Sequence, residues 1–293
     1  MIAVTAPTSR IGRHLVRDLL AAGEKVRVVA RDPARLGPAV AGRVEVVAGT
    51  HADAAVVTEA FHDADAVFWL VPAAPHASSP DEAYSGFARP ALRAFTSFAG
   101  RVVGVSALGR GTPAAGRAGH VTATLAMDDA IVATGVAYRA LTLPSFMDNV
   151  ARQAGPIAAR GVWSGPAAPG LAVPTVAARD IAAAAAGWLT DSTWSGHQEV
   201  PVLGPEDLSP DRMAEIASEV LGRPVRYQQI EPEAFLANLV RAGHSEAMAR
   251  GLLDMALAKN DGLDLGVTRT PASSSPTTFR QWCEETLEPA VAG

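Results

Sequence analysis

The sequence predicts an α/β protein built on a doubly wound, mostly parallel sheet. Short apolar, β-rich runs alternate with segments of helical periodicity from the first residues onward, which is typical of repeated βα units. The run over 65–71 is apolar on both faces, as buried parallel strands are. The 293 residues are long enough for one such domain of about 150 residues and a smaller addition.

The first three strands are predicted at 2–5, 25–30 and 43–48. A helix follows the first strand, with apolar residues at helical spacing and Gly23 where a helix end is expected. After the second strand, Asp32 and Pro33 read as a helix cap followed by proline at the first helical position.

Three more strands are predicted at 65–71, 101–106 and 137–143, with helical patterns between them. Right-handed crossovers place the carboxyl ends of parallel strands along one edge, where doubly wound sheets bind ligands. That edge should carry Ala6, Ala30, Pro72 and Ser106.

Beyond Asn149 the composition changes. Residues 155–174 are rich in glycine, proline and alanine and are expected to be mostly loop with an extended piece. Asp180 is expected to cap a helix over 181–189, and a strand is expected over 199–203. Further helices should begin at Pro210 and Pro232, and residues 268–278 should form a surface connection.

Composition excludes several classes of function. The net charge of −5 comes with scattered rather than clustered basic residues, so no nucleic-acid partner is expected. The longest apolar stretches fall far short of the roughly 20 residues of a membrane helix, and no leader precedes the first strand, so a cytoplasmic protein is expected. Cys283 is the only cysteine, which excludes an internal disulfide and suggests a reducing compartment. The histidines are dispersed and suggest no metal site. The sequence contains no G-x-S-x-G motif, so serine hydrolysis is not expected.

The turn from the first strand into the first helix is the candidate phosphate loop. Of the glycines in a G-x-x-G-x-x-G spacing only Gly12 is present, because Ala6 and Ser9 stand at the other two positions. Both carry a Cβ and do not easily adopt a positive φ, although both are small. The helix N-terminus still offers N–H groups to an anion. A turn without ligand is the alternative. The expected cofactor contacts here are Thr8, Ser9, Arg10, Ile11 and Gly12.

The end of the second strand indicates which dinucleotide would bind. An acidic residue there would bind the ribose of NAD, whereas an arginine accommodates the additional phosphate of NADP. This position holds Arg31, with Arg35 one turn later and Arg10 within reach. A guanidinium can bind a phosphate through two parallel hydrogen bonds. We therefore expect NADP(H), with a solvated surface arginine as the alternative.

These segments together resemble the NmrA-like family of atypical short-chain dehydrogenases/reductases. Residues 4–12, Val-Thr-Ala-Pro-Thr-Ser-Arg-Ile-Gly, are similar to the family's V-T-G-A-T-G-x-x-G, and residues 26–36 resemble its second strand with an NADP-type arginine. Residues 64–72 resemble its fourth strand, whose end (Val71 and Pro72) lies along the cofactor. The remaining matches are 102–106, 135–138, the F-x-x-N element at 146–149, 179–182 and 203–209.

The resemblance implies a Rossmann-type NAD(P)-binding domain over 1–153, to which 174–204 returns. It also implies a smaller, mostly helical substrate-binding cap over 154–173 and 205–293. The chain departs from the family pattern at Thr50, where an acidic residue is frequent, and at Thr142, where an arginine is usual. The Y-x-x-x-K pair of short-chain dehydrogenases would fall on His120 and Thr124, so its tyrosine and lysine are both missing.

Candidate catalytic residues remain at the carboxyl edge of the sheet. His120 could act as a general acid, because imidazole titrates near neutral pH, and Ser106 could hydrogen-bond a substrate oxygen. A loop histidine and a strand-end hydrogen bond are the alternatives. Asn149 is expected to tie backbone near the pocket. The expected substrate wall consists of Phe146, Met147, Trp163 and Phe235, which core packing would explain equally well.

The leading hypothesis is an NADPH-dependent oxidoreductase that transfers hydride to a small apolar, quinone-like or conjugated carbonyl acceptor. Such acceptors stabilise negative charge themselves and tolerate the missing Tyr/Lys pair. Two alternatives stay open: a redox sensor that binds NADP(H) without turnover, and an isomerase or cyclase without cofactor. A small-molecule substrate and a monomer or homodimer are expected.

Overall fold

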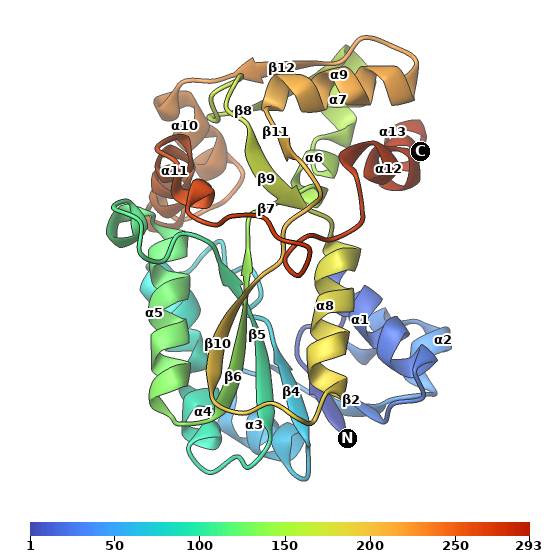
Figure 1. Cartoon of the computed structure of the whole chain (residues 1–293), viewed down its shortest axis with the longest axis vertical. Coiled ribbons are helices and arrows are strands. Elements are labelled where there is room, and N and C mark those ends of the chain that lie inside the picture. Colours follow the sequence, from blue (N-terminus) through green and yellow to red (C-terminus); the bar gives the residue numbers. More distant parts are fainter.

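The computed structural model describes all residues from Met1 to Gly293. Two parts are stacked along the long axis, a sheet domain below and a smaller part above (Figure 1). The sheet domain confirms the predicted Rossmann-type fold, since all seven strands of its sheet are parallel. Their order is β10-β6-β5-β4-β1-β2-β3. No helix is both long and apolar enough to cross a bilayer.

The strands of this sheet are short and mostly buried. They are β1 (Ile2–Val4), β2 (Val26–Ala30), β3 (Glu45–Ala48), β4 (Ala66–Trp69), β5 (Arg101–Ala107), β6 (Ala137–Leu143) and β10 (His197–Pro201). The predicted bounds of the sixth strand are confirmed, and those of the others differ at the ends by a few residues. All four residues of β4 are buried, as its apolar run over both faces predicted.

Helices cover both faces of the sheet. One face carries α1 (Arg10–Ala21) and α8 (Ala178–Thr190), which pack on each other and on β1, β5 and β6. The other face carries α3 (Ala54–Phe61), α4 (Phe87–Phe95) and α5 (His120–Ala133). The short segment α2 (Pro38–Ala41) follows β2. Gly23, at φ 81, follows the end of α1, and the Asp32 carboxylate caps a short 3₁₀ helix over Pro33–Leu36, both as predicted.

The upper part holds the remaining elements, in which two small sheets, β11-β9-β7 and β12-β8, are surrounded by helices. The strands are β7 (Ser145–Phe146), β8 (Val162–Gly165), β9 (Val173–Val176), β11 (Asp207–Leu208) and β12 (Arg226–Gln229). The helices are α6 (Asp148–Ala151), α7 (Ala154–Arg160), α9 (Pro210–Leu221), α10 (Pro232–Arg241), α11 (Glu246–Asn260), α12 (Phe279–Trp282) and α13 (Glu288–Ala292). The starts of α9 and α10 confirm the predictions at Pro210 and Pro232.

Three predictions in the second half of the chain are wrong. Residues 155–174 are not mostly loop, because Ile157 is fully buried and anchors α7, and β8 pairs with the distant β12. Asp180 does not cap α8, which begins at Ala178, two residues earlier. Instead its carboxylate accepts hydrogen bonds from the backbone N–H (3.0 Å) and the hydroxyl (2.7 Å) of Thr277.

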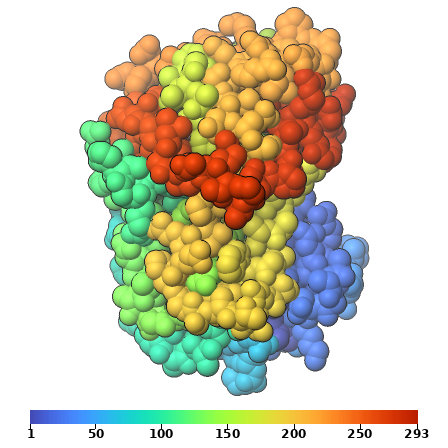
Figure 2. Space-filling view, in the orientation of Figure 1, coloured from blue at the N-terminus to red at the C-terminus, as the bar shows by residue number.

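The segment 268–278 is also more buried than its composition predicted. Ser273, Ser275 and Thr277 are buried, and Leu203 bridges to Ser274. Figure 2 shows this red segment crossing the face of the molecule between the two parts. It therefore connects α11 with α12 as a packed strap, and the Asp180 carboxylate holds its end.

Candidate cofactor and active site

The loop between β1 and α1 keeps a compact form without its two missing glycines. Ala6 adopts φ 49, a left-handed conformation that costs an alanine about 1 kcal/mol and that we did not expect of it. Ser9 has an ordinary extended conformation, and its hydroxyl oxygen caps α1 by accepting from the N–H of Gly12 at 3.0 Å. The Cβ atoms at positions 6 and 9, where glycine was expected, are thus accommodated by strain at Ala6 and by a helix cap at Ser9.

The loop leaves no room for a side chain at Gly12. A Cβ on Gly12 would lie 2.3 Å from the carbonyl oxygen of Ala6 and 2.9 Å from the Cα of Pro7. The helix therefore begins against the loop backbone. The N–H groups of its first turn, at Arg10 and Ile11, have no intrahelical acceptor, so they remain available to an anion.

Arg10 turns away from this anion position. Its guanidinium forms an ion pair with Asp148 of α6 at 3.1 Å, although the arginine side chain is half exposed. The other carboxylate oxygen of Asp148 accepts from the N–H of Ala178 at 3.0 Å, at the start of α8. Arg10 and Asp148 therefore tie the β1–α1 loop to the upper part of the molecule.

Arg31 and Arg35 are exposed at the end of β2, and neither makes a side-chain hydrogen bond or an ion pair. The next strand ends beside them, where the imidazole Nε2 of His51 lies 3.0 Å from the carbonyl oxygen of Leu70. Burial lowers the pKa of His51 to about 4, with a smaller lowering by the charge of Arg31. Two arginines without partners thus stand at the edge where the additional phosphate of NADP was expected.

The fourth strand end is fixed to the first. The hydroxyl of Thr5 donates to the carbonyl oxygen of Phe68 at 3.0 Å and accepts from the N–H of Leu70 at 2.9 Å. Val71 and Pro72 follow as partly exposed residues at the same edge as the β1–α1 loop. The predicted cofactor residues are therefore gathered along one edge, apart from the diverted Arg10 side chain.

His120 is the first residue of α5 and is buried against the upper part of the molecule. Its Nε2 lies 3.1 Å from the carbonyl oxygen of Met248 in α11, and its Nδ1 lies 3.4 Å from the hydroxyl of Tyr84. Close approach of α11 depends on two glycines. A Cβ on Gly119, at φ 53, would meet the Gly251 carbonyl at 2.0 Å, and one on Gly251 would meet the His120 ring at 3.0 Å.

Ser106 faces α5 and donates its hydroxyl to the Asp128 carboxylate. The second oxygen of Asp128 accepts from the hydroxyl of Tyr138 at 2.6 Å. Asp128 is 1% exposed, and burial raises its pKa to about 6 against the opposite effect of these two hydrogen bonds. We did not predict this buried cluster. Polar residues four apart, at 120, 124 and 128 on one face of the helix, were the signal available.

The expected substrate wall is spread over several elements. Phe146 packs on the core between the sheet and α1, Met147 is buried in the core of the upper part, and Trp163 lies 4.7 Å from the Tyr227 ring. Phe235 is partly buried on α10. Asn149 is exposed and makes no side-chain hydrogen bond, so the backbone link expected of it is provided by its neighbour, Asp148.

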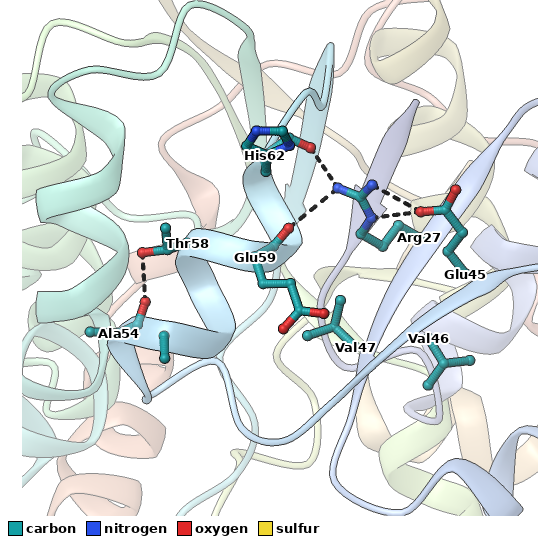
Figure 3. Close-up of a pocket in the computed structure, with 9 residues that line it drawn as sticks. Arg27, Glu45, Val46, Val47, Ala54, Thr58, Glu59 and His62 are labelled. Atoms are coloured by element: carbon teal, nitrogen blue, oxygen red, sulfur yellow. Dashed lines mark hydrogen bonds and ion pairs between the residues drawn. The ribbon is translucent and has the colours of Figure 1, made fainter.

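Two open grooves lie elsewhere and contain none of the predicted site residues. The groove in Figure 3, of about 660 Å³, lies on edge strand β3 and α3. Its arginine, Arg27, is already bound to the Glu45 carboxylate and to carbonyl oxygens at the end of α3. The second, of about 690 Å³, lies between α5 and α11, lined partly by Gly119 and Thr122. Neither brings together groups for hydride transfer.

Residues 8–192 match the NAD(P)H-binding family, and residues 128–282 match the NmrA-like family. The chain belongs to the NmrA-like family of NAD(P)H-binding proteins. This assignment confirms the predicted resemblance to the NmrA-like family. It also confirms that the chain contains an NAD(P)H-binding domain.

Three relatives illustrate the range of the family. The chain is 31% identical to the (4-alkanoyl-5-oxo-2,5-dihydrofuran-3-yl)methyl phosphate reductase of Streptomyces griseus subsp. griseus, over 98% of both chains. It is 29% identical to the NAD(P)H azoreductase of Xenophilus azovorans, over 90% of this chain and 89% of the relative. The NADPH-dependent quinone oxidoreductase of Escherichia coli, solved with NADPH, superposes with a TM-score of 0.79 at 19% identity, over 97% of this chain and 99% of the other.

Proposed function

We propose that this NmrA-like protein is an NADPH-dependent reductase that transfers hydride to a small apolar, quinone-like or conjugated carbonyl acceptor. The observation that carries the proposal is the edge of the sheet itself. An uncapped pair of helix N–H groups lies beside Gly12, and two arginines without partners stand at the end of β2. A pyrophosphate and a ribose phosphate would find their ligands there.

The relatives support the acceptor class. The substrate named for the Streptomyces relative is a dihydrofuran with an oxo and an alkanoyl group, which is a conjugated carbonyl compound. The Xenophilus relative is named for azo reduction and the Escherichia coli structure for quinone reduction. All three acceptors spread negative charge over an extended π system. Hydride transfer to such compounds suits a chain that lacks tyrosine and lysine at positions 120 and 124.

The upper part is the proposed substrate cap. In this proposal residues 154–173 and 205–293 close over the nicotinamide end of the cofactor, while 1–153 and 174–204 form the NADP(H)-binding domain. The ion pair of Arg10 with Asp148 and the strap over 268–278 connect the two regions. His120 and Ser106 remain the proposed polar groups beside the substrate.

The cofactor proposal is tested by calorimetric titration of the purified protein with NADPH and NADH. Arg31→Ala should weaken NADPH binding about tenfold to a hundredfold and leave NADH binding unchanged, because a hydrogen bond to a charged group contributes about 1.5–3 kcal/mol. Arg93→Ala is the matched control, since Arg93 is exposed on α4 and has no side-chain partner. Equal affinity of wild type and Arg31→Ala for NADPH would reject the phosphate role of Arg31.

A second candidate function is a sensor that binds NADP(H) without turnover. It is favoured by one observation: Ser106 is bound to Asp128 and His120 to the Met248 carbonyl, so both candidate catalytic groups have internal partners. A sensor must distinguish the two redox forms, because a ligand shifts states only through differential affinity. Equal affinity for NADPH and NADP+ would exclude it.

A further inference from the structure

The proposed reduction lacks an assigned proton donor, and the inference below rests on that proposed function. When hydride reaches a carbonyl compound, negative charge develops on oxygen and must be neutralised by a proton. Helix α5 offers His120 and Thr124 where a tyrosine and a lysine would stand. A phenol supplied from another element would restore the chemistry without restoring the sequence pattern.

Tyr84 places a phenol at this end of α5. It lies in a single π-helical turn, Glu82–Gly86, that precedes α4, and such turns are frequent at functional sites. Its hydroxyl lies 3.4 Å from Nδ1 of His120, and the two rings meet edge to face at 5.8 Å. The other two tyrosines are committed elsewhere, Tyr138 to the Asp128 carboxylate and Tyr227 to the Ala167 carbonyl.

Hydrogen bonding decides which member of the pair holds a transferable proton. Nε2 of His120 faces the Met248 carbonyl oxygen, which only accepts, so Nε2 carries the hydrogen and Nδ1 has a free lone pair. Burial lowers the pKa of His120, which keeps the ring neutral at neutral pH. Burial also raises the pKa of Tyr84, which keeps the phenol protonated. The phenol proton is therefore the only one in the pair that is not fixed on backbone.

A chain of contacts connects the segment that holds Tyr84 with the carboxyl edge of the sheet. Phe87, one turn later, contacts the ring of His51 with centroids 4.8 Å apart, and His51 binds the Leu70 carbonyl at the end of β4. Tyr84 itself is only partly buried, whereas Ser106 is 5% exposed. The Tyr84 hydroxyl has a long contact, 3.4 Å to Nδ1 of His120, and is not bound to a carboxylate as the Ser106 hydroxyl is.

We propose that Tyr84 is the proton donor of this reductase and that His120 positions its hydroxyl. Hydride passes from C4 of NADPH to the electrophilic carbon of the acceptor, the C=O or conjugated C=C π bond breaks, and the electron pair moves to oxygen. The Tyr84 O–H bond breaks and its proton joins that oxygen, giving NADP+, the alcohol or enol, and a tyrosinate. Water then returns a proton to the tyrosinate and leaves hydroxide to the buffer.

Tyr84→Phe tests this assignment, because it removes only the hydroxyl. The matched control is Tyr227→Phe, which removes a hydroxyl bound to backbone within the upper part. Each protein is assayed with NADPH and two kinds of acceptor: an aryl ketone or enone, whose oxygen must be protonated, and a cationic triphenylmethane dye, whose carbon takes hydride and becomes neutral without a proton. Thermal unfolding and the Kd of NADPH are measured alongside.

With Tyr84→Phe we expect kcat for the carbonyl acceptor to fall about 10²- to 10³-fold, the range of general acid catalysis. The rate with the dye and the Kd of NADPH should stay within about twofold, and Tyr227→Phe should change neither rate. Equal losses with both acceptors, or a carbonyl rate within about threefold of wild type, would overturn the role of Tyr84. A wild-type protein that reduces the dye but no carbonyl acceptor would overturn it and leave hydride transfer standing. No reduction of any acceptor would overturn the proposed function together with this inference.

Discussion

Replacing Gly12 by alanine is the sharpest perturbation of the cofactor loop. The added Cβ would lie 2.3 Å from the Ala6 carbonyl oxygen, where an ordinary carbon–oxygen contact is about 3.3 Å. The atoms in its way belong to the backbone of Ala6 and Pro7, so no side chain can swing aside. Ala6 already holds a left-handed φ of 49, and the loop has little room to relax by further strain.

We expect Gly12→Ala to destabilise the fold by about 2 kcal/mol, within the range of overpacking, and to lower Tm by about 4 °C. Because the relieving movement displaces the first turn of α1, NADPH affinity should fall at least tenfold. Urea unfolding and calorimetric titration measure the two effects. The control is Gly155→Ala in α7, where a Cβ meets nothing within 4 Å and helix propensity predicts a gain of up to about 1 kcal/mol.

A second change in the same loop acts in the opposite direction. Ala6→Gly removes the penalty of a positive φ and should leave stability unchanged or raise it by up to about 1 kcal/mol.

If Gly12→Ala matched the wild type in both unfolding and NADPH binding, the close approach of helix and loop would not be what shapes this site.

The remaining predictions concern buried titratable groups. Because the folded pKa of His51 is lowered from 6.5 to about 4, the stability contributed by its neutral ring is present above pH 6.5 and lost as pH falls through 4. At 1.36 kcal/mol per pKa unit, we expect the free energy of unfolding, measured with urea, to fall by about 3 kcal/mol. His51→Phe should abolish this pH dependence. The folded pKa of Asp128 is raised from 3.8 to about 6, so the stability contributed by its protonated carboxyl is present below pH 3.8 and lost as pH rises through 6. Asp128→Asn should remove this decline of about 3 kcal/mol in the free energy of unfolding. An unchanged pH profile of stability in the variant would contradict the raised pKa of Asp128. Burial raises the pKa of the Cys283 thiol to about 12, so iodoacetamide should label it only under unfolding conditions, and rapid labelling of the native protein would refute its burial.

How far the sequence predicts this structure depends on whether the deciding contacts are local. The sheet was predictable because its strands are short β-rich runs at regular spacing, and because β4 is apolar on both faces, as a buried parallel strand is. Residues 155–174 were not, because β8 is a strand only through its pairing with β12, more than 60 residues away. Composition alone gave a loop there.

The site shows the same limit. Arg31 and Gly12 were identifiable, since each has a role at a fixed place in a βα unit. Tyr84 carries no local signal, because its contact with His120 spans 36 residues and depends on how α4 meets α5. The left-handed conformation of Ala6 was unexpected, because the conformational propensity of alanine argues against it. In the structure the close contact of the Ala6 carbonyl with Gly12 outweighs that propensity.

The most direct test of the account is isotopic. The purified protein is incubated with NADPH deuterated at C4 on either face and with a conjugated carbonyl acceptor, and the product is examined by mass spectrometry. The account predicts that one of the two deuterated cofactors places a single deuterium on carbon in the product, and that NADP+ forms in equal amount. Tight binding of NADPH with no deuterium in the product from any acceptor would contradict the reductase and favour the sensor.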